Sequence, residues 1–118
     1  MPGPHAFPKR ERLTRRREYT AVFQHGRKRV GPEFICFTLR RDGQGRKMGF
    51  AVSRKVGNAV TRNRVKRYLR EIYRVHRDDL SDDIHLVFVA RPGAAKLDFH
   101  QCAKAVHRLL NSGEESRG

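Results

Sequence analysis

The residues with the most evident chemistry are basic and lie close together at 62–74. Arginine or lysine occupies positions 62, 64, 66, 67, 70 and 74, and Glu71 is the only acid among them. At 100° per residue, most of these cations share one arc of a helix. Like charges three or four residues apart cost an isolated helix about 0.2–0.5 kcal/mol per pair. Because a bound polyanion reverses the sign of these terms, the pattern favours phosphate binding over the alternative of a solvated face.

No catalytic motif accompanies these cations. The sequence lacks Gly-x-Ser-x-Gly, His-Glu-x-x-His and a phosphate-binding P-loop, and it has no paired carboxylates on a helix. Cys36 and Cys102 do not form a Cys-x-x-Cys pair, so we expect buried thiols. Only His100 and His107 are spaced to share a helix face, and we expect no metal site. The chain is therefore expected to carry out no bond chemistry itself.

The composition also indicates a polyanionic partner. The 118 residues carry a net charge of +15 with a pI near 11.2, and 37% are apolar, which suits one domain with a modest core. Residues 1–77 hold 22 Lys and Arg against 5 Asp and Glu, so the partner is expected to bind there. The longest apolar run, at 86–90, is too short for a membrane span. We expect a cytoplasmic protein that binds neither membrane nor DNA.

The basic stretch also resembles a known family. Lys55-Val-Gly-Asn-Ala-Val, followed by Thr61-Arg-Asn-Arg-Val-Lys-Arg, is similar to the Arg-Asn-Arg signature of the protein subunit of bacterial ribonuclease P. The resemblance extends from Arg12-Leu13 through Ala90-Arg91-Pro92 and leaves out only the two tails. It implies an RNA-binding subunit that helps a catalytic RNA, which holds the Mg2+ ions, to remove the 5′ leader of precursor tRNA. The alternative is a ribosomal or assembly protein that binds rRNA without a nuclease role.

The resemblance divides the site residues into two groups. One group would bind the catalytic RNA: Arg62, Asn63, Arg64, Lys66, Arg67 and Arg70. The other would form a cleft for the leader: Tyr19, Phe23, Phe37, Ser53, Arg54 and Lys55. Aromatic rings beside cations suit a single strand, because bases stack on the rings while the backbone follows the charge. A position in the core is the alternative for Tyr19 and Phe23.

Periodicity and turn residues predict the elements that carry these groups. We expect a basic flexible arm at 1–12, one domain at 13–111 and a disordered tail at 112–118. The domain is expected to contain a helix from Thr14, its N-cap, to 25, a basic loop at 27–32, a strand at 34–39, a hairpin loop at 42–45, a strand at 47–53, a helix at 58–76, an acidic loop at 76–83, a strand at 84–90 and an Asp98-capped helix to about Leu110.

This αββαβα order indicates an α/β fold, a two-layer sandwich with a mixed sheet of three to four strands. General topology rules favour a right-handed crossover between the strands at 47–53 and 84–90. The resemblance implies instead the rare left-handed form, which is also found in a ribosomal protein domain. Three questions stay open. The N-cap of the helix at 58–76 is either Asn58 or Thr61. Gly49 allows a close backbone approach or forms a bulge, and Arg91 faces the RNA or is a plain surface charge.

Overall fold

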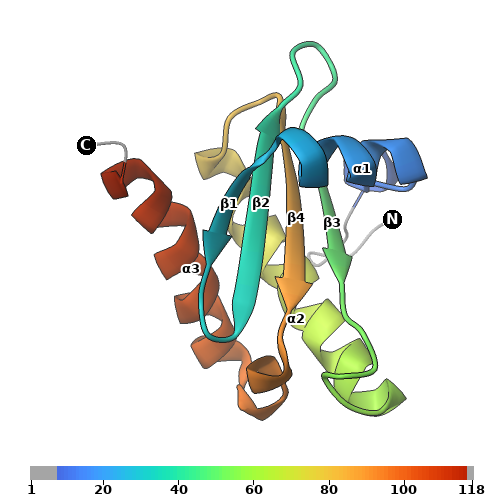
Figure 1. Cartoon of the computed structure of the whole chain (residues 1–118), viewed down its shortest axis with the longest axis vertical. Coiled ribbons are helices and arrows are strands. Elements are labelled where there is room, and N and C mark those ends of the chain that lie inside the picture. Colours follow the sequence, from blue (N-terminus) through green and yellow to red (C-terminus); the bar gives the residue numbers. More distant parts are fainter. Residues whose placement is uncertain (1–7, 117–118) are drawn as a thin grey trace.

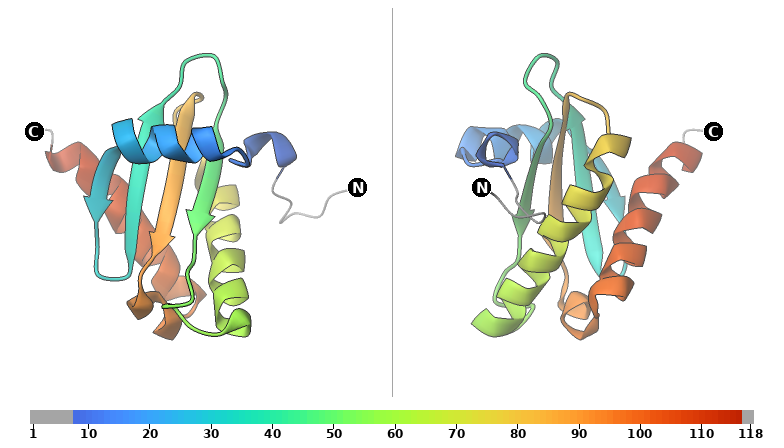
Figure 2. Two further views of the ribbon diagram at one scale, coloured as in Figure 1. Left: turned by 45° about the vertical axis from the view of Figure 1, so that its right-hand side comes forward. Right: turned by 180° about the vertical axis from the view of Figure 1, so that it is seen from behind.

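The computed structural model describes residues 8–116, and the side chains of residues 8–111. It contains one four-stranded sheet in the order β1-β2-β4-β3. Helix α1 crosses one face of the sheet, and α2 and α3 cover the other face (Figure 1; Figure 2). The predicted α/β class with a mixed sheet is confirmed. The elements are η1 (Lys9–Glu11), α1 (Arg16–His25), β1 (Arg27–Val30), β2 (Phe34–Arg40), β3 (Lys47–Ala51), α2 (Ala59–His76), η2 (Arg77–Asp79), β4 (Ile84–Ala90), η3 (Pro92–Lys96) and α3 (Phe99–Ser116).

Strand β4 occupies the centre of the sheet. It pairs antiparallel with β2 and parallel with β3, and Leu86, Val87 and Phe88 are at most 2% exposed. The predicted hairpin at 42–45 is therefore wrong, because β4 is inserted between the two strands that this loop joins. A strand that is apolar on both faces suits the centre, where neighbours cover every side. Helix α2 provides the crossover from β3 to β4, and its left-handed form stays a prediction.

Strand β1 lies where the sequence analysis places a basic loop, so that expectation is also wrong. Three of its four residues are Arg or Lys, and no apolar alternation marks a strand. The strand forms because the chain turns back tightly: the Gly31 N–H donates to the Phe34 carbonyl at 2.9 Å, and β1 pairs antiparallel with β2. Basic side chains are typical of an edge strand, since they discourage pairing with another chain.

The helix starts are fixed by side-chain caps. Asn58 caps α2, because its Oδ1 accepts from the Thr61 N–H at 2.9 Å, which decides between the two alternatives. Asp98 caps α3 through a reciprocal pair of hydrogen bonds with Gln101, as predicted. The predicted Thr14 cap is wrong. Helix α1 instead begins after Arg15, because the N3 residue Glu18 accepts from the N–H groups of Thr14 and Arg15, each at 3.1 Å.

The core forms on both faces of the sheet. Val65, Leu69 and Ile72 of α2 are at most 2% exposed and pack on the face that also carries Phe34 and Phe88. A smaller cluster on the other face joins Leu13, Val22 and Val87 under α1. The two thiols are buried as expected, and burial raises the pKa of Cys36 to about 12 and that of Cys102 to about 11.

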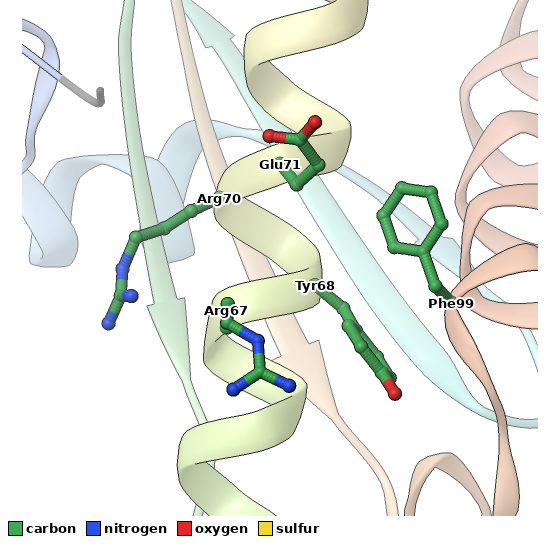
Figure 3. A pocket seen from close by; sticks show the side chains of 5 residues that line it. All are labelled: Arg67, Tyr68, Arg70, Glu71 and Phe99. Carbon is green, nitrogen blue, oxygen red and sulfur yellow. The ribbon is translucent and has the colours of Figure 1, made fainter. Parts of the chain in front are cut away.

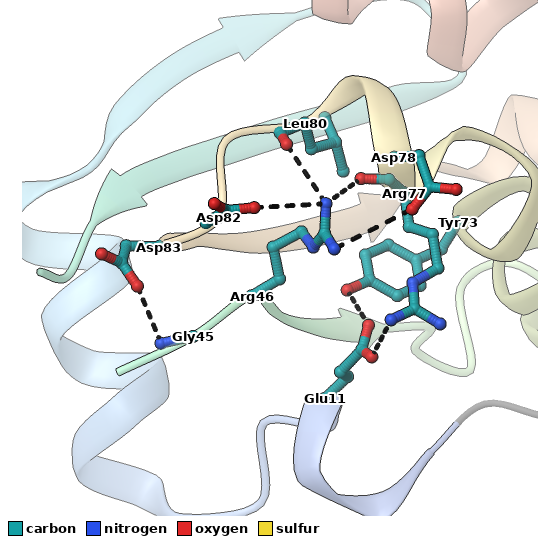
Figure 4. A network of polar contacts seen from close by, with 9 residues as sticks. All are labelled: Glu11, Gly45, Arg46, Tyr73, Arg77, Asp78, Leu80, Asp82 and Asp83. Carbon is teal, nitrogen blue, oxygen red and sulfur yellow. Dashed lines mark hydrogen bonds and ion pairs between the residues drawn. The ribbon is translucent and has the colours of Figure 1, made fainter. Parts of the chain in front are cut away.

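The chain ends differ from the expected arm and tail. Residues 1–7 of the predicted arm lie outside the described residues, but Glu11 in η1 is only 5% exposed. Its carboxylate accepts from the Tyr73 hydroxyl at 2.7 Å and pairs with Arg77, which ties η1 to the end of α2 (Figure 4). The last helix, α3, continues to Ser116, beyond the predicted end at Leu110. The last two residues of the predicted tail lie outside the described residues.

The acidic loop is also fixed by polar contacts. Arg46 donates to the carbonyls of Arg77 and Leu80, at 2.6 and 3.3 Å, where α2 ends (Figure 4). Asp83 accepts from the N–H groups of Gly43 and Gly45, which holds the connection that leads into β3. Part of the acidic charge of this loop therefore has a structural role. That the loop faces away from RNA stays a prediction.

Glu18 supports a first prediction, on pH. Burial alone would raise the pKa of Glu18, but hydrogen bonds from Lys47 and from the Arg15 and Thr14 N–H groups lower it to about 2, from 4.5. Since the folded-state pKa is the lower one, the stabilisation is present above pH 4.5 and is lost as the pH falls towards 2. Glu18→Gln should lower the free energy of unfolding by about 1–2 kcal/mol at pH 7.

Urea unfolding at pH 7 and pH 3 measures this effect. The gap in stability between Glu18→Gln and the wild type should narrow at pH 3. Asp42→Asn is the matched control, because its pair with Arg40 is exposed and contributes little. An equal gap at both pH values would contradict the role of the Glu18 carboxylate.

Candidate nucleic-acid interface

The predicted cations of helix α2 lie outside its buried stripe; Arg67 is exposed and the others are partly exposed. The group Arg62, Asn63, Arg64, Lys66, Arg67 and Arg70 is called here the α2 arc. Among the described residues, no carboxylate forms an ion pair with any cation of the arc. Arg74, one turn further along, differs, because its guanidinium makes two hydrogen bonds to Glu71, at 2.7 and 2.9 Å. The arc is therefore uncompensated positive charge.

The side chains of the arc are held in place by contacts that leave their charge available. Arg64 donates to the Ala95 carbonyl at 2.8 Å, which fixes it beside η3. The guanidinium carbon of Arg70 lies 5.7 Å from the centroid of the Phe50 ring, and that of Arg67 lies 5.7 Å from the centroid of Tyr68. The buried Nε of Arg62 has no partner within the described part of the chain. Such anchoring lowers the entropic cost of binding an anion.

The predicted aromatic residues come together on the other face of the sheet. The Phe23 ring packs edge-on against Phe37 with centroids 4.9 Å apart, and Tyr19 lies 6.4 Å from Phe23. Phe23 is 41% exposed, which excludes the alternative that it is a core residue. The Lys28 ammonium lies 5.9 Å from the centroid of Phe37. Helix α1 and strands β1 and β2 thus place rings and a cation side by side.

The strand register extends this aromatic group with a row that the sequence analysis did not identify as part of the site. Val30 pairs with Ile35, Ile35 with Val89, and Val89 with Ala51, so the four side chains share one face across the whole sheet. Val30 is 58% exposed, Ala51 is exposed, and the other two are partly buried. This row is called here the apolar strip. Only the pairing of strands could reveal it, since its members come from four separate segments.

Gly49 is explained by the same face. A Cβ added at Gly49 would lie 2.6 Å from Cζ of Tyr19, far inside van der Waals contact. Of the two alternatives for Gly49, the close approach is therefore correct. The glycine allows the Tyr19 ring to lie directly on β3.

The remaining predicted residues connect the two surfaces. Ser53, Arg54 and Lys55 follow β3 after Val52 and are exposed. They form a turn in which the Lys55 N–H donates to Ser53 Oγ at 3.3 Å. This turn leads from Ala51, at the end of the apolar strip, to the start of α2. A polyanion that follows the turn would meet both surfaces. The role of each residue in binding stays a prediction.

Other kinds of site find no support in the described residues. They contain no group of three or more His, Cys, Asp or Glu side chains able to hold a metal ion. His107 lies near His76 of α2, with ring centroids 5.9 Å apart, rather than forming a site with His100. None of the described helices is long and apolar enough to cross a bilayer. Arg91 donates to the Gly31 carbonyl at 2.9 Å, which ties η3 to the turn after β1.

The fold and its two adjoining surfaces define a small basic α/β protein that binds nucleic acid. The model of the Ribonuclease P family matches residues 7–113. The chain therefore belongs to the Ribonuclease P family. A ribonuclease P protein component of Desulfovibrio desulfuricans is 44% identical over 108 residues, which cover 88% of this chain and 83% of the relative. One from Dictyoglomus thermophilum is 39% identical over 102 residues, 84% of each chain.

Solved structures agree on the fold. The RNase P protein of Staphylococcus aureus superimposes with a TM-score of 0.81 at 24% identity, over 87% of this chain and 94% of that one. The RNase P protein of Thermotoga maritima gives a TM-score of 0.76 at 26% identity, over 86% and 96%. The family resemblance drawn from the Arg-Asn-Arg stretch is thus confirmed.

A second prediction concerns Gly49. Gly49→Ala should destabilise the protein by about 1–3 kcal/mol, because the new methyl group overlaps the Tyr19 ring. The double variant Gly49→Ala with Tyr19→Ala should lose less than the sum of the two single changes, since removal of the ring makes room for the methyl group. Urea unfolding of the four proteins in the cycle measures this coupling. Strictly additive losses would contradict the contact.

Proposed function

We propose that the chain is the RNA-binding subunit of a ribonucleoprotein endonuclease that removes the 5′ leader of precursor tRNA. The observation that carries the proposal is the meeting of the uncompensated α2 arc with the aromatic and apolar sheet face at the turn 53–55. Family membership supports the assignment and disfavours the ribosomal alternative. The bond chemistry would belong to the catalytic RNA, and the compartment would be the cytoplasm.

In this proposal the α2 arc binds the catalytic RNA. Its guanidinium groups suit phosphate oxygens, because a planar fork of N–H donors matches two oxygens at once. Each phosphate that is neutralised releases condensed counterions, so affinity would fall steeply with salt. The contacts to Ala95, Phe50 and Tyr68 support this role, since they hold the side chains without neutralising them.

The sheet face would receive the single-stranded leader. Bases would stack on Tyr19, Phe23 and Phe37 and lie along the apolar strip, while Ser53, Arg54 and Lys55 would bind the backbone. Stacking contributes about 1–3 kcal/mol per base and tolerates any sequence. The leader would therefore be bound with little regard to its sequence.

Mg2+ enters this proposal through the RNA. The catalytic ions would be held by phosphates of the RNA subunit. The protein would lower the Mg2+ concentration needed for tight substrate binding, because its cations screen the same phosphate repulsion that free Mg2+ otherwise screens.

A third prediction tests the assignment itself. At low Mg2+, cleavage of precursor tRNA by the cognate catalytic RNA should be fast with the chain present and slow without it. Arg67→Ala should weaken assembly about 5–10-fold and reduce the slope of log affinity against log salt by about 1. Arg74→Ala is the matched control, because Glu71 already neutralises Arg74, and its effect should be smaller.

Measured cleavage rates and binding isotherms at several salt concentrations decide the outcome. If the chain binds rRNA and leaves cleavage by the catalytic RNA unchanged, the ribosomal alternative replaces the proposal. Equal effects of Arg67→Ala and Arg74→Ala would contradict the special role of uncompensated charge.

A fourth prediction separates substrate binding from assembly. Phe23→Ala should weaken the binding of precursor tRNA to the holoenzyme by about tenfold, because one stacking partner is lost. The affinity for mature tRNA, which has no leader, should not change. Phe23→Tyr, which keeps the ring, serves as the control. Equal losses for precursor and mature tRNA would show that Phe23 does not contact the leader.

A further inference from the structure

A second aromatic site lies between α2 and α3, away from the sheet face that carries Phe23. A hollow of about 500 Å3 is lined by Arg67, Tyr68, Arg70, Glu71 and Phe99 (Figure 3). Tyr68 and Phe99 are only partly buried, whereas Val65 and Leu69 of helix α2 are fully buried.

The walls of this hollow combine flat rings with charge. The Tyr68 and Phe99 rings meet at 73° with centroids 5.7 Å apart, so a third flat group can stack on one ring and meet the other edge-on. Figure 3 shows Tyr68 between Arg67 and Phe99. Arg67 and Arg70, on the α2 side of the hollow, belong to the α2 arc, so the aromatic hollow and the phosphate-binding charge lie next to each other.

Glu71 also lines the hollow. Two hydrogen bonds from Arg74 fix its carboxylate, at 2.7 and 2.9 Å. An acid at this point repels a phosphate, so the phosphates of a bound strand would lie nearer to Arg67 and Arg70 than to Glu71.

We propose that this hollow binds one unpaired nucleobase of the catalytic RNA, stacked against Tyr68, while Arg67 and Arg70 bind the flanking phosphates. The inference rests on the proposed function and adds a base-binding site to its RNA interface. Charge identifies the occupant: an apolar peptide would leave both guanidinium groups unpaired, whereas a nucleotide satisfies the rings and the cations together. Unpaired bases are what proteins reach in folded RNA, because paired ones keep their faces stacked.

The fifth prediction compares Tyr68→Leu with Tyr68→Phe. Tyr68→Leu keeps apolar volume but removes the ring, and it should weaken binding to the catalytic RNA by about tenfold. The loss should be the same at low and high salt, because stacking releases no counterions, whereas Arg67→Ala changes the salt slope. Tyr68→Phe should bind as tightly as the wild type, and thermal unfolding of each variant checks that it is folded.

A tryptophan reporter gives a second readout on a folded protein. The chain contains no tryptophan, so Tyr68→Trp introduces a single fluorophore at the hollow. Addition of the catalytic RNA should quench its emission through stacking, and Thr20→Trp, on the exposed side of α1, should respond less. This measurement decides the case if Tyr68→Leu does not fold.

The outcomes separate the two proposals. If the wild-type chain fails to bind the catalytic RNA, the proposed function falls. If it binds, but Tyr68→Leu binds equally well or Tyr68→Trp is not quenched, the base-binding hollow is overturned and the function stands. A loss for Tyr68→Leu that disappears at high salt also overturns it, because that loss would be electrostatic.

Discussion

The structure depends on positive charge on α2 that no acid within residues 8–111 neutralises through an ion pair. Helix α2 tolerates repulsion among neighbouring cations because Val65, Leu69 and Ile72 bury their side chains almost completely on the opposite side. Burial of one such side chain contributes about 1.5–3 kcal/mol, several times the cost of one like-charged pair on a helix surface. The acids of the chain are used elsewhere, as Glu11 with Tyr73 and Glu18 with Lys47 show. The fold thus keeps the cations of α2 close together despite their mutual repulsion, and a bound RNA would remove that repulsion.

The sheet topology explains why the two binding surfaces adjoin. Strand β3 lies at the edge of the sheet, and the chain leaves it through the turn 53–55 to enter α2. One strand end therefore leads from the apolar strip on one face to the cationic helix on the other. Had β3 occupied the centre of the sheet, neighbouring strands would separate the two surfaces. The insertion of β4 between β2 and β3 therefore matters for the site, because it places β3 at the sheet edge, next to the turn into α2.

Much of this was predictable, for reasons that differ between elements. The cap at Asp98 follows from local spacing, and the sequence predicts it, whereas the choice between Asn58 and Thr61 as the cap of α2 depended on the hydrogen bond from the Thr61 N–H to Asn58. The central place of β4 follows from its apolar run. Strand β1 and the pairing of β3 do not, because strand neighbours are set by contacts between distant segments. The residues of the leader cleft were assigned from the family resemblance. The contact of Tyr19 with Gly49 could be found only in the three-dimensional structure.

Aromatic rings on two faces imply a division of labour between charge and stacking. In the two proposals above, cations would give affinity that depends on salt and not on base identity, and rings would accept any base, so neither surface would read a sequence. Selectivity would then come from shape: which RNA segments are single-stranded, and where they lie relative to the bound helix. If the distance between the α1 face and the α2–α3 hollow is fixed, only an RNA whose single-stranded segments lie at that distance can contact both. The packed sheet between them supplies such rigidity, since its central strand is buried on both sides.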